Sequence, residues 1–145
     1  MSDIVSNIDE LMRKTCYLLD IFPCRVPRKS DNRYFIIEEY FQQNRQELNA
    51  KFCRILLKLY CYYDFWLLVD DTTVKNPEPY RLVEWIDDCF AAKISNIDII
   101  LPDCNAMIIL KSDDLYMSLY NPNEQLKNLV SQLTSAEGLF FYKKF

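Results

Sequence analysis

Three short apolar runs separated by two turn-forming clusters occupy residues 96–122, and no other stretch constrains the fold as strongly. The runs cover residues 97–101, 106–111 and 115–120 and are rich in β-branched and aromatic side chains. The clusters between them contain Pro, Asp, Asn and Ser, which favour turns. This arrangement predicts a three-stranded antiparallel meander from Asn96 to Tyr120.

The third predicted strand has two different faces, because successive side chains of a strand point to opposite sides of the sheet. Its apolar face consists of Leu115, Met117 and Leu119. The other face is aromatic and half-polar, with Tyr116, Ser118 and Tyr120. A sheet with an apolar face must be covered by helices, so we looked for helical patterns in the rest of the chain.

The N-terminal segment predicts a helix that begins near Ser6 or Asn7 and stops before Pro23. Its apolar residues recur at helical spacing as far as Cys16 and Leu19. Residues 22–32 follow as a connecting loop with two prolines and several basic side chains.

Three further helices are predicted before the C-terminal part of the chain, over residues 33–43, 44–63 and 79–92. The helix over 44–63 has the most regular apolar stripe: Phe52, Ile55, Leu56, Leu59, Tyr60 and Tyr63. Its opposite side carries basic residues, with Glu47 and Lys51 spaced as an i,i+4 ion pair.

The C-terminal part predicts one more helix and one more strand. Asn121 and Pro122 suit the cap and first position of a helix, and Gly138, the only glycine, suits its C-cap. Residues 65–69 and 139–143 are apolar runs that predict two further strands. The fold class is therefore α+β: one domain spanning 1–145, with a mainly antiparallel sheet of about five strands and helices packed chiefly on one face.

Charge is distributed unevenly between the two halves of the chain. Residues 1–60 contain 10 basic and 8 acidic residues, whereas residues 61–145 contain 7 and 13, which together give the net charge of −4. The acid thus gathers in the half that contains the meander. Such a surface repels nucleic-acid phosphates but complements a basic protein.

Composition points to a cytoplasmic protein without a membrane span. No signal peptide precedes the first helix, and the most apolar window, residues 55–69, is short and contains Lys58 and Asp64. The six cysteines show no C-x-x-C pair, which is typical of reduced, mostly buried thiols. The frequent Ile, Asn, Lys and Tyr are typical of a low-GC bacterium.

No catalytic motif is present in the sequence. The chain has no histidine, the commonest acid–base residue, and one glycine cannot form a Gly-rich phosphate loop. Cys104 is the cysteine that we expect to be exposed, but it lacks a histidine to activate it. An alternative enzyme would use a divalent metal held by neighbouring acids: Asp70, Asp71, Asp113 and Asp114.

The sequence favours a small soluble interaction protein without catalysis or cofactor. In its most concrete form this is an acidic inhibitor of the immunity, antitoxin or anti-defence type that binds a basic partner protein and is itself a monomer or homodimer. The remaining alternative is a homodimeric ligand-binding accessory domain. The candidate partner-binding residues are Asp98, Asp113, Asp114, Tyr116, Tyr120, Phe140 and Tyr142.

Overall fold

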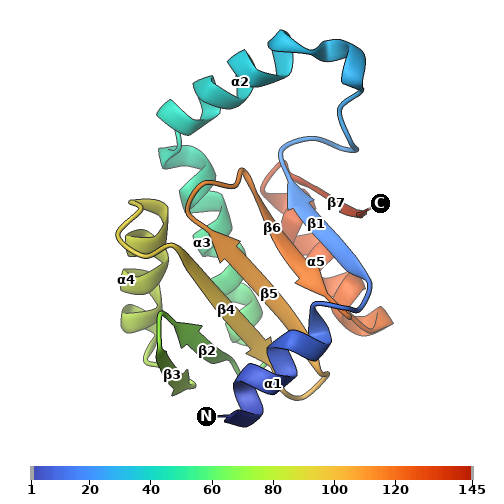
Figure 1. The fold of residues 1–145 in the computed structure, drawn as a ribbon. Helices are drawn as coiled ribbons and strands as arrows, with labels where there is room; N and C mark the ends of the chain where they lie inside the picture. Colours follow the sequence, from blue (N-terminus) through green and yellow to red (C-terminus); the bar gives the residue numbers. More distant parts are fainter. Residues whose placement is uncertain (1, 145) are drawn as a thin grey trace.

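The computed structural model describes residues 2–144 as one seven-stranded antiparallel sheet with helices on both faces (Figure 1). The strands are β1 (Cys16–Asp20), β2 (Trp66–Val69), β3 (Thr72–Lys75), β4 (Asn96–Leu101), β5 (Ala106–Lys111), β6 (Tyr116–Tyr120) and β7 (Phe140–Lys143). The helices are α1 (Ser2–Leu11), α2 (Asn32–Gln43), α3 (Gln46–Tyr60), α4 (Pro79–Phe90) and α5 (Glu124–Ala136), with a short 3₁₀ turn, η1 (Arg28–Ser30). The strand order is β3-β2-β4-β5-β6-β1-β7.

The predicted meander is confirmed, and it forms the centre of the sheet. Strands β4, β5 and β6 pair antiparallel in sequence order, joined by turns at the predicted Pro/Asp/Asn and Ser/Asp clusters. Asn105 has a positive φ of 53° in the first of these turns, a conformation that asparagine tolerates well. The α+β class is confirmed, while the sheet has seven strands rather than about five.

The first predicted helix is wrong beyond Leu11. Residues 16–20 form β1, which lies between β6 and β7 and pairs with both. Cys16 and Leu19 fit a helical stripe, but the same segment can bury one side chain on each face of a sheet. Leu18 and Leu19, which point to opposite faces, are both buried. Packing between two strands therefore outweighs the local helical pattern.

The other additional strand, β3, lies between the predicted strand over 65–69 and the predicted helix over 79–92, where the sequence predicts neither a strand nor a helix. It forms a hairpin with β2 through Asp70 and Asp71, and Asp70 adopts the positive φ of 52° that such tight turns require. At the C-terminus, α5 begins two residues later than the Asn121-Pro122 pair predicts. Its cap is Asn123, whose Oδ1 accepts from the Leu126 amide at 2.8 Å. Gly138 follows α5 with φ 73°, as predicted.

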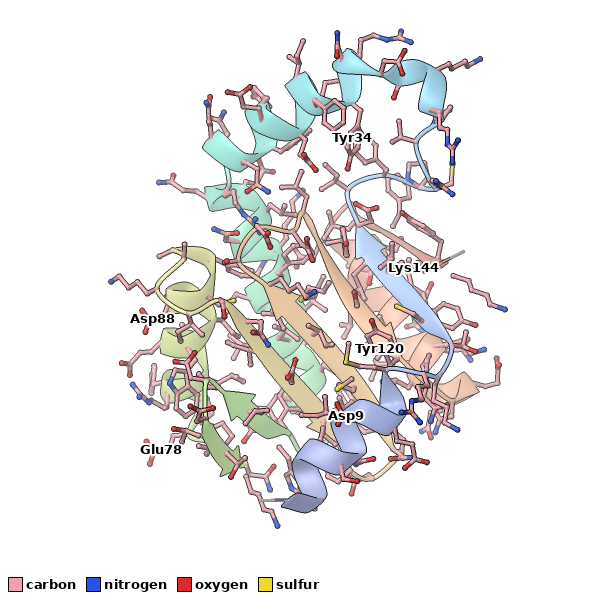
Figure 2. All side chains as sticks on the ribbon, viewed as in Figure 1. Asp9, Tyr34, Glu78, Asp88, Tyr120 and Lys144 are labelled. Carbon is pink, nitrogen blue, oxygen red and sulfur yellow. The ribbon has the colours of Figure 1, made fainter. Side chains whose placement is uncertain are left out.

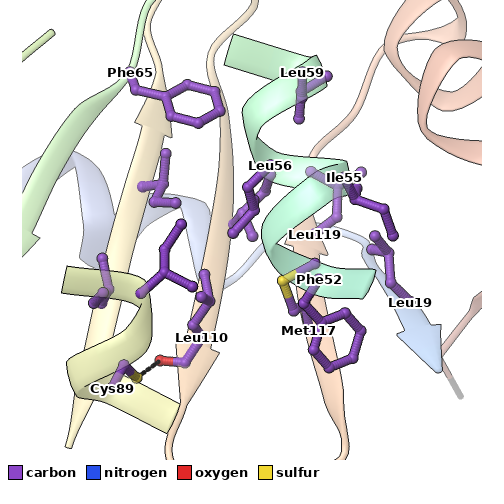
Figure 3. Packing of buried hydrophobic residues seen from close by; sticks show 14 of the residues in the cluster. Leu19, Phe52, Ile55, Leu56, Leu59, Phe65, Cys89, Leu110, Met117 and Leu119 are labelled. Atoms are coloured by element: carbon purple, nitrogen blue, oxygen red, sulfur yellow. Dashed lines mark hydrogen bonds between the residues drawn. The ribbon is translucent and has the colours of Figure 1, made fainter. Parts of the chain in front are cut away.

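The main hydrophobic core lies between α3, α4 and α5 and one face of the sheet. Phe52, Leu56 and Leu59 on α3 are fully buried. Phe52 lies beside Met117 of β6, and Leu59 lies toward Phe65 (Figure 3). Each such side chain contributes roughly 1.5–3 kcal/mol of burial energy. The predicted basic stripe of α3 is paired: Arg54 and Lys58 contact Glu137 at 2.7 and 3.8 Å, and Lys51 contacts Glu47 at 3.5 Å.

Helix α1 covers part of the opposite sheet face, whereas α2 covers none of it. Ile8 and Leu11 of α1 pack in a second apolar cluster with Ile100, Met107 and Ile109. Figure 1 shows α2 beyond the end of the sheet, connected to β1 by a long arched segment. The end of this face formed by β6, β1 and β7 therefore lies beneath the arch rather than beneath a packed helix.

Candidate binding cleft

A cleft of about 780 Å³ lies between the arched segment, α2 and the end of strands β6, β1 and β7. Its lining combines carboxylates, tyrosines and exposed cations. The carboxylates are Asp20, Asp31, Glu38 and Asp114; the tyrosines are Tyr34, Tyr116 and Tyr142; the cations are Arg25, Arg28 and Lys144. A cleft of this volume is large enough for a small organic ligand or a side chain of another protein.

The sheet register brings the floor of the cleft together from three strands. Asp20 of β1 pairs with Tyr116 of β6 on one side and with Phe140 of β7 on the other. Leu18 pairs with Tyr142 in the next row of the same face. Residues opposite each other in an antiparallel pair share a face, so Asp20, Tyr116 and Tyr142 converge although they lie up to 122 positions apart.

Asp20 is a buried carboxylate with hydrogen-bond donors but no cationic partner. It is 7% exposed; the Tyr142 hydroxyl donates to its Oδ2 at 2.6 Å, and the Ile21 amide donates to its Oδ1 at 2.7 Å. It forms no salt bridge with any lysine or arginine of residues 2–144. Burial raises the pKa of Asp20 above its ordinary value, although the Tyr142 hydrogen bond acts in the opposite direction.

The wall formed by α2 contributes Tyr34 and Glu38. Tyr34 projects from α2 toward the end of the sheet (Figure 2), and its hydroxyl donates to Glu38 Oε2 at 3.2 Å. Burial and the nearby Glu38 charge raise the pKa of Tyr34 to about 12. Burial also raises the pKa of Tyr116 and Tyr142. All three phenols therefore stay neutral at pH 7 and keep their hydroxyl protons.

Arg45, between α2 and α3, ties α2 to the sheet. It is 8% exposed, and its Nη1 donates to the carbonyl oxygens of Asp114 at 2.8 Å and Ser112 at 3.2 Å. Gln42 Nε2 donates to the Asp113 carbonyl at 2.6 Å. These bonds hold the C-terminal end of α2 against the β5–β6 turn and so fix one side of the cleft.

The seven residues proposed from sequence are only partly brought together. Tyr116 and Tyr142 line the cleft with Asp114. The other four of the seven lie outside the cleft lining: Asp98, Tyr120, Phe140 and Asp113, whose side chain is exposed.

Asp98 is not the surface acid that the sequence suggests. It is 8% exposed on β4, between Leu68 and Ile109, and its Oδ1 accepts from Asn96 Nδ2 at 3.3 Å. Its neighbours on both adjacent strands are apolar and cover it. Tyr120 packs near α1, and Phe140 is 43% exposed on the last strand.

The acids named for a metal site lie in two separate turns. Asp70 and Asp71 are in the β2–β3 turn, and Asp113 and Asp114 are in the β5–β6 turn. Within residues 2–144, no three acids or thiols are grouped so that they could hold a metal ion. Cys104, expected to be exposed, is half-buried, and burial raises the pKa of its thiol. Cys24 and Cys61 are the exposed thiols.

Four residues of the site were not identified from sequence: Asp20, Tyr34, Glu38 and Arg45. Asp20 lay in the mispredicted part of the first helix, so its position on the sheet could not be deduced. Tyr34 and Glu38 are spaced i,i+4, which places both side chains on one face of a helix and is the sequence signal that could have identified them. Arg45 falls at the start of the predicted helix over 44–63, and no pattern in the sequence indicates that it is buried between two helices.

Comparisons of the chain with models of protein families, with curated proteins and with solved structures gave no match. Functional inference therefore depends on the geometry of the cleft and of α2. None of the helices within residues 2–144 is long and apolar enough to cross a membrane.

Proposed function

We propose that this protein is a non-catalytic cytoplasmic interaction protein, an inhibitor of the immunity, antitoxin or anti-defence type, that binds a basic partner protein through α2 and the adjoining cleft. The observation that supports this most is the exposure of α2. A helix whose apolar side chains are left in solvent gains its packing from a second molecule.

None of the twelve residues of α2 is buried. Phe35 and Ile36 are each 65% exposed, Tyr40 is 58% exposed and Ile37 is 44% exposed. A helix shorter than about 12–15 residues is marginal in water without tertiary packing. Contiguous exposed apolar side chains mark interaction surfaces in folded proteins. Together these properties favour α2 as a contact surface for another protein.

Charge around α2 favours a basic partner at one end. Glu38 and Glu39 lie in its C-terminal half, and Gln42 connects that half to the turn that carries Asp113 and Asp114. The N-terminal end of α2 is basic, with Arg28, Lys29 and Arg33 in or just before its first turn. We therefore expect the basic surface of the partner to lie against the C-terminal half, where complementary charge accelerates association and fixes orientation.

A pull-down from host lysate at low and moderate salt tests this function. The wild type is compared with Phe35→Ser/Ile36→Ser, with Asp113→Ser/Asp114→Ser and with the control Tyr80→Ser. Tyr80 is 86% exposed on α4, so the control removes an aromatic side chain that is even more exposed and lies on another helix.

We expect one stoichiometric basic partner that is retained by the Tyr80 control and lost by the α2 variant. Binding to the Asp variant should be weakened and less sensitive to salt. Equal capture by the α2 variant and by the wild type would contradict the proposal. A wild type that elutes as a dimer in size-exclusion chromatography, with a monomeric α2 variant, would instead favour the homodimeric accessory domain.

A further inference from the structure

We infer that the cleft binds an organic cation, an alkylammonium or guanidinium group, with Asp20 as its counter-ion. The same cation can belong to a free amine or to a lysine or arginine side chain of another protein. Binding of a free amine is independent of the proposed function, whereas binding of a side chain rests on it, because the partner would then place its cation in this cleft.

Asp20 is a buried carboxylate that forms no salt bridge with a cation of residues 2–144. A buried carboxylate is costly unless it is paired, and more than nine-tenths of Asp20 is removed from solvent. Its donors are the Tyr142 hydroxyl and the main chain after Asp20. A carboxylate offers about four lone-pair sites, so acceptor capacity remains free on the cleft side. A cation from outside the chain would supply the missing charge.

Aromatic side chains line the cleft together with Asp20. Tyr34, Tyr116 and Tyr142 come from α2, β6 and β7 and line the same cleft. Tyrosine rings attract ammonium and guanidinium groups through their faces, and more strongly where water is excluded. A carboxylate surrounded by tyrosines is therefore suited to an organic cation with an apolar stem.

The less exposed charged side chains of the cleft lining are acidic, whereas its basic side chains are all exposed. Glu38 and Asp114 are half-buried and add negative charge near Asp20. The lining cations, Arg25, Arg28 and Lys144, are exposed, where solvent and salt weaken their fields. The interior is thus negative, and a ligand with one cationic end directed inward fits best.

Isothermal titration calorimetry with two cationic probes tests the inference. The probes are agmatine, a free guanidinium amine, and the capped peptide acetyl-Ala-Ala-Arg-Ala-Ala-amide; the same peptide with citrulline in place of arginine is the neutral control. The proteins are wild type, Asp20→Asn and Asp98→Asn. Asp98 is the matched control because it is equally buried on the same sheet face but lies outside the cleft lining.

We expect saturable one-to-one binding of a cationic probe to wild type and to Asp98→Asn. Asp20→Asn should bind about tenfold more weakly or worse, because a buried charge loses its counter-ion. Agmatine binding would show that a free amine suffices, whereas binding of the peptide alone would show that a protein side chain is the source. Circular dichroism checks that each variant is folded.

Three results would overturn the inference: no saturable binding of either probe to wild type, equal loss in both Asn variants, or equal binding of the citrulline peptide. If Asp20→Asn does not fold, Tyr34→Leu serves as the second variant. Tyr34 lies on α2 outside the buried core, and its replacement should weaken cation binding several-fold. Unchanged binding to that variant would also count against the site.

Discussion

Replacing Arg45 by alanine tests how the cleft is held in place. Arg45 Nη1 donates to the carbonyl oxygens of Ser112 and Asp114, its Nε donates to Asn49 Oδ1 at 3.0 Å, and its guanidinium lies 5.3 Å from the Phe90 ring centre. Its Nη2 is buried without a hydrogen-bond partner in the part of the chain that the structure describes. Burial lowers the pKa of Arg45, an indication of the desolvation that its hydrogen bonds must offset.

The expected change in the free energy of unfolding is the difference between the lost hydrogen bonds and the removed desolvation cost of Arg45. Hydrogen bonds from a charged donor contribute about 1.5–3 kcal/mol each, so the two carbonyl bonds together give roughly 3–6 kcal/mol. Removal of the side chain also removes the desolvation cost of the unpaired Nη2, which is about 1–3 kcal/mol and partly offsets this loss. We therefore expect Arg45→Ala to lower the free energy of unfolding by about 2–3 kcal/mol, or roughly 5–10 °C in Tm for a chain of this size.

Urea denaturation followed by tryptophan fluorescence measures this loss. Arg81→Ala is the matched control, because Arg81 also lies over an aromatic ring, Trp85 at 4.5 Å, but on the exposed surface of α4. The control should lose less than about 1 kcal/mol. Equal losses in the two variants would refute the idea that Arg45 fixes α2 to the sheet.

Two further predictions concern the end of α5. Gly138→Ala should destabilise the protein by about 1 kcal/mol in thermal melts, because φ is 73°, while a new Cβ would make only an ordinary van der Waals contact with Lys51 Nζ at 3.9 Å. An unchanged Tm would contradict the strain argument. Glu137→Gln should lower stability at neutral pH, since hydrogen bonds from Arg54 hold the pKa of Glu137 below its ordinary 4.5. A carboxyl group whose pKa is lowered by folding stabilises the folded state at pH values above its ordinary pKa. The stability difference between wild type and variant should therefore shrink as pH falls below about 4.5 and disappear below the lowered pKa of Glu137. A difference that grows in acid would contradict this assignment.

Elements with strong local patterns could be predicted from the sequence. The meander and α3 follow from alternation and from a regular apolar stripe, and Gly138 marks the end of α5. Errors arose where a segment fits two structures. The apolar spacing over residues 79–92 predicts that Tyr80 faces the protein core, but Tyr80 is exposed. Trp85 is buried instead, because α4 packs through its Leu82/Ile86 side.

The cleft could be predicted only in part, because it depends on a long-range pairing. Tyr116, Tyr142 and Asp114 were identified from their own segments. Asp20 reaches them only because β1 inserts between β6 and β7, and no local pattern specifies that insertion. Burial of Asp98 depends in part on the same kind of pairing: Ile109 lies in the next strand of the meander, but Leu68 lies in β2, which precedes α4 in the chain.

Hydrogen–deuterium exchange of α2, measured by mass spectrometry, tests the central proposal most directly. In the isolated protein, the amides of α2 should exchange far faster than those of α3, because α2 has no buried residue while α3 forms the core. Adding the captured partner should slow exchange in α2 and leave α4 unchanged. Equal protection of α2 and α3 in the isolated protein, or protection by the partner at α4 alone, would contradict the proposal that α2 is the unoccupied contact surface.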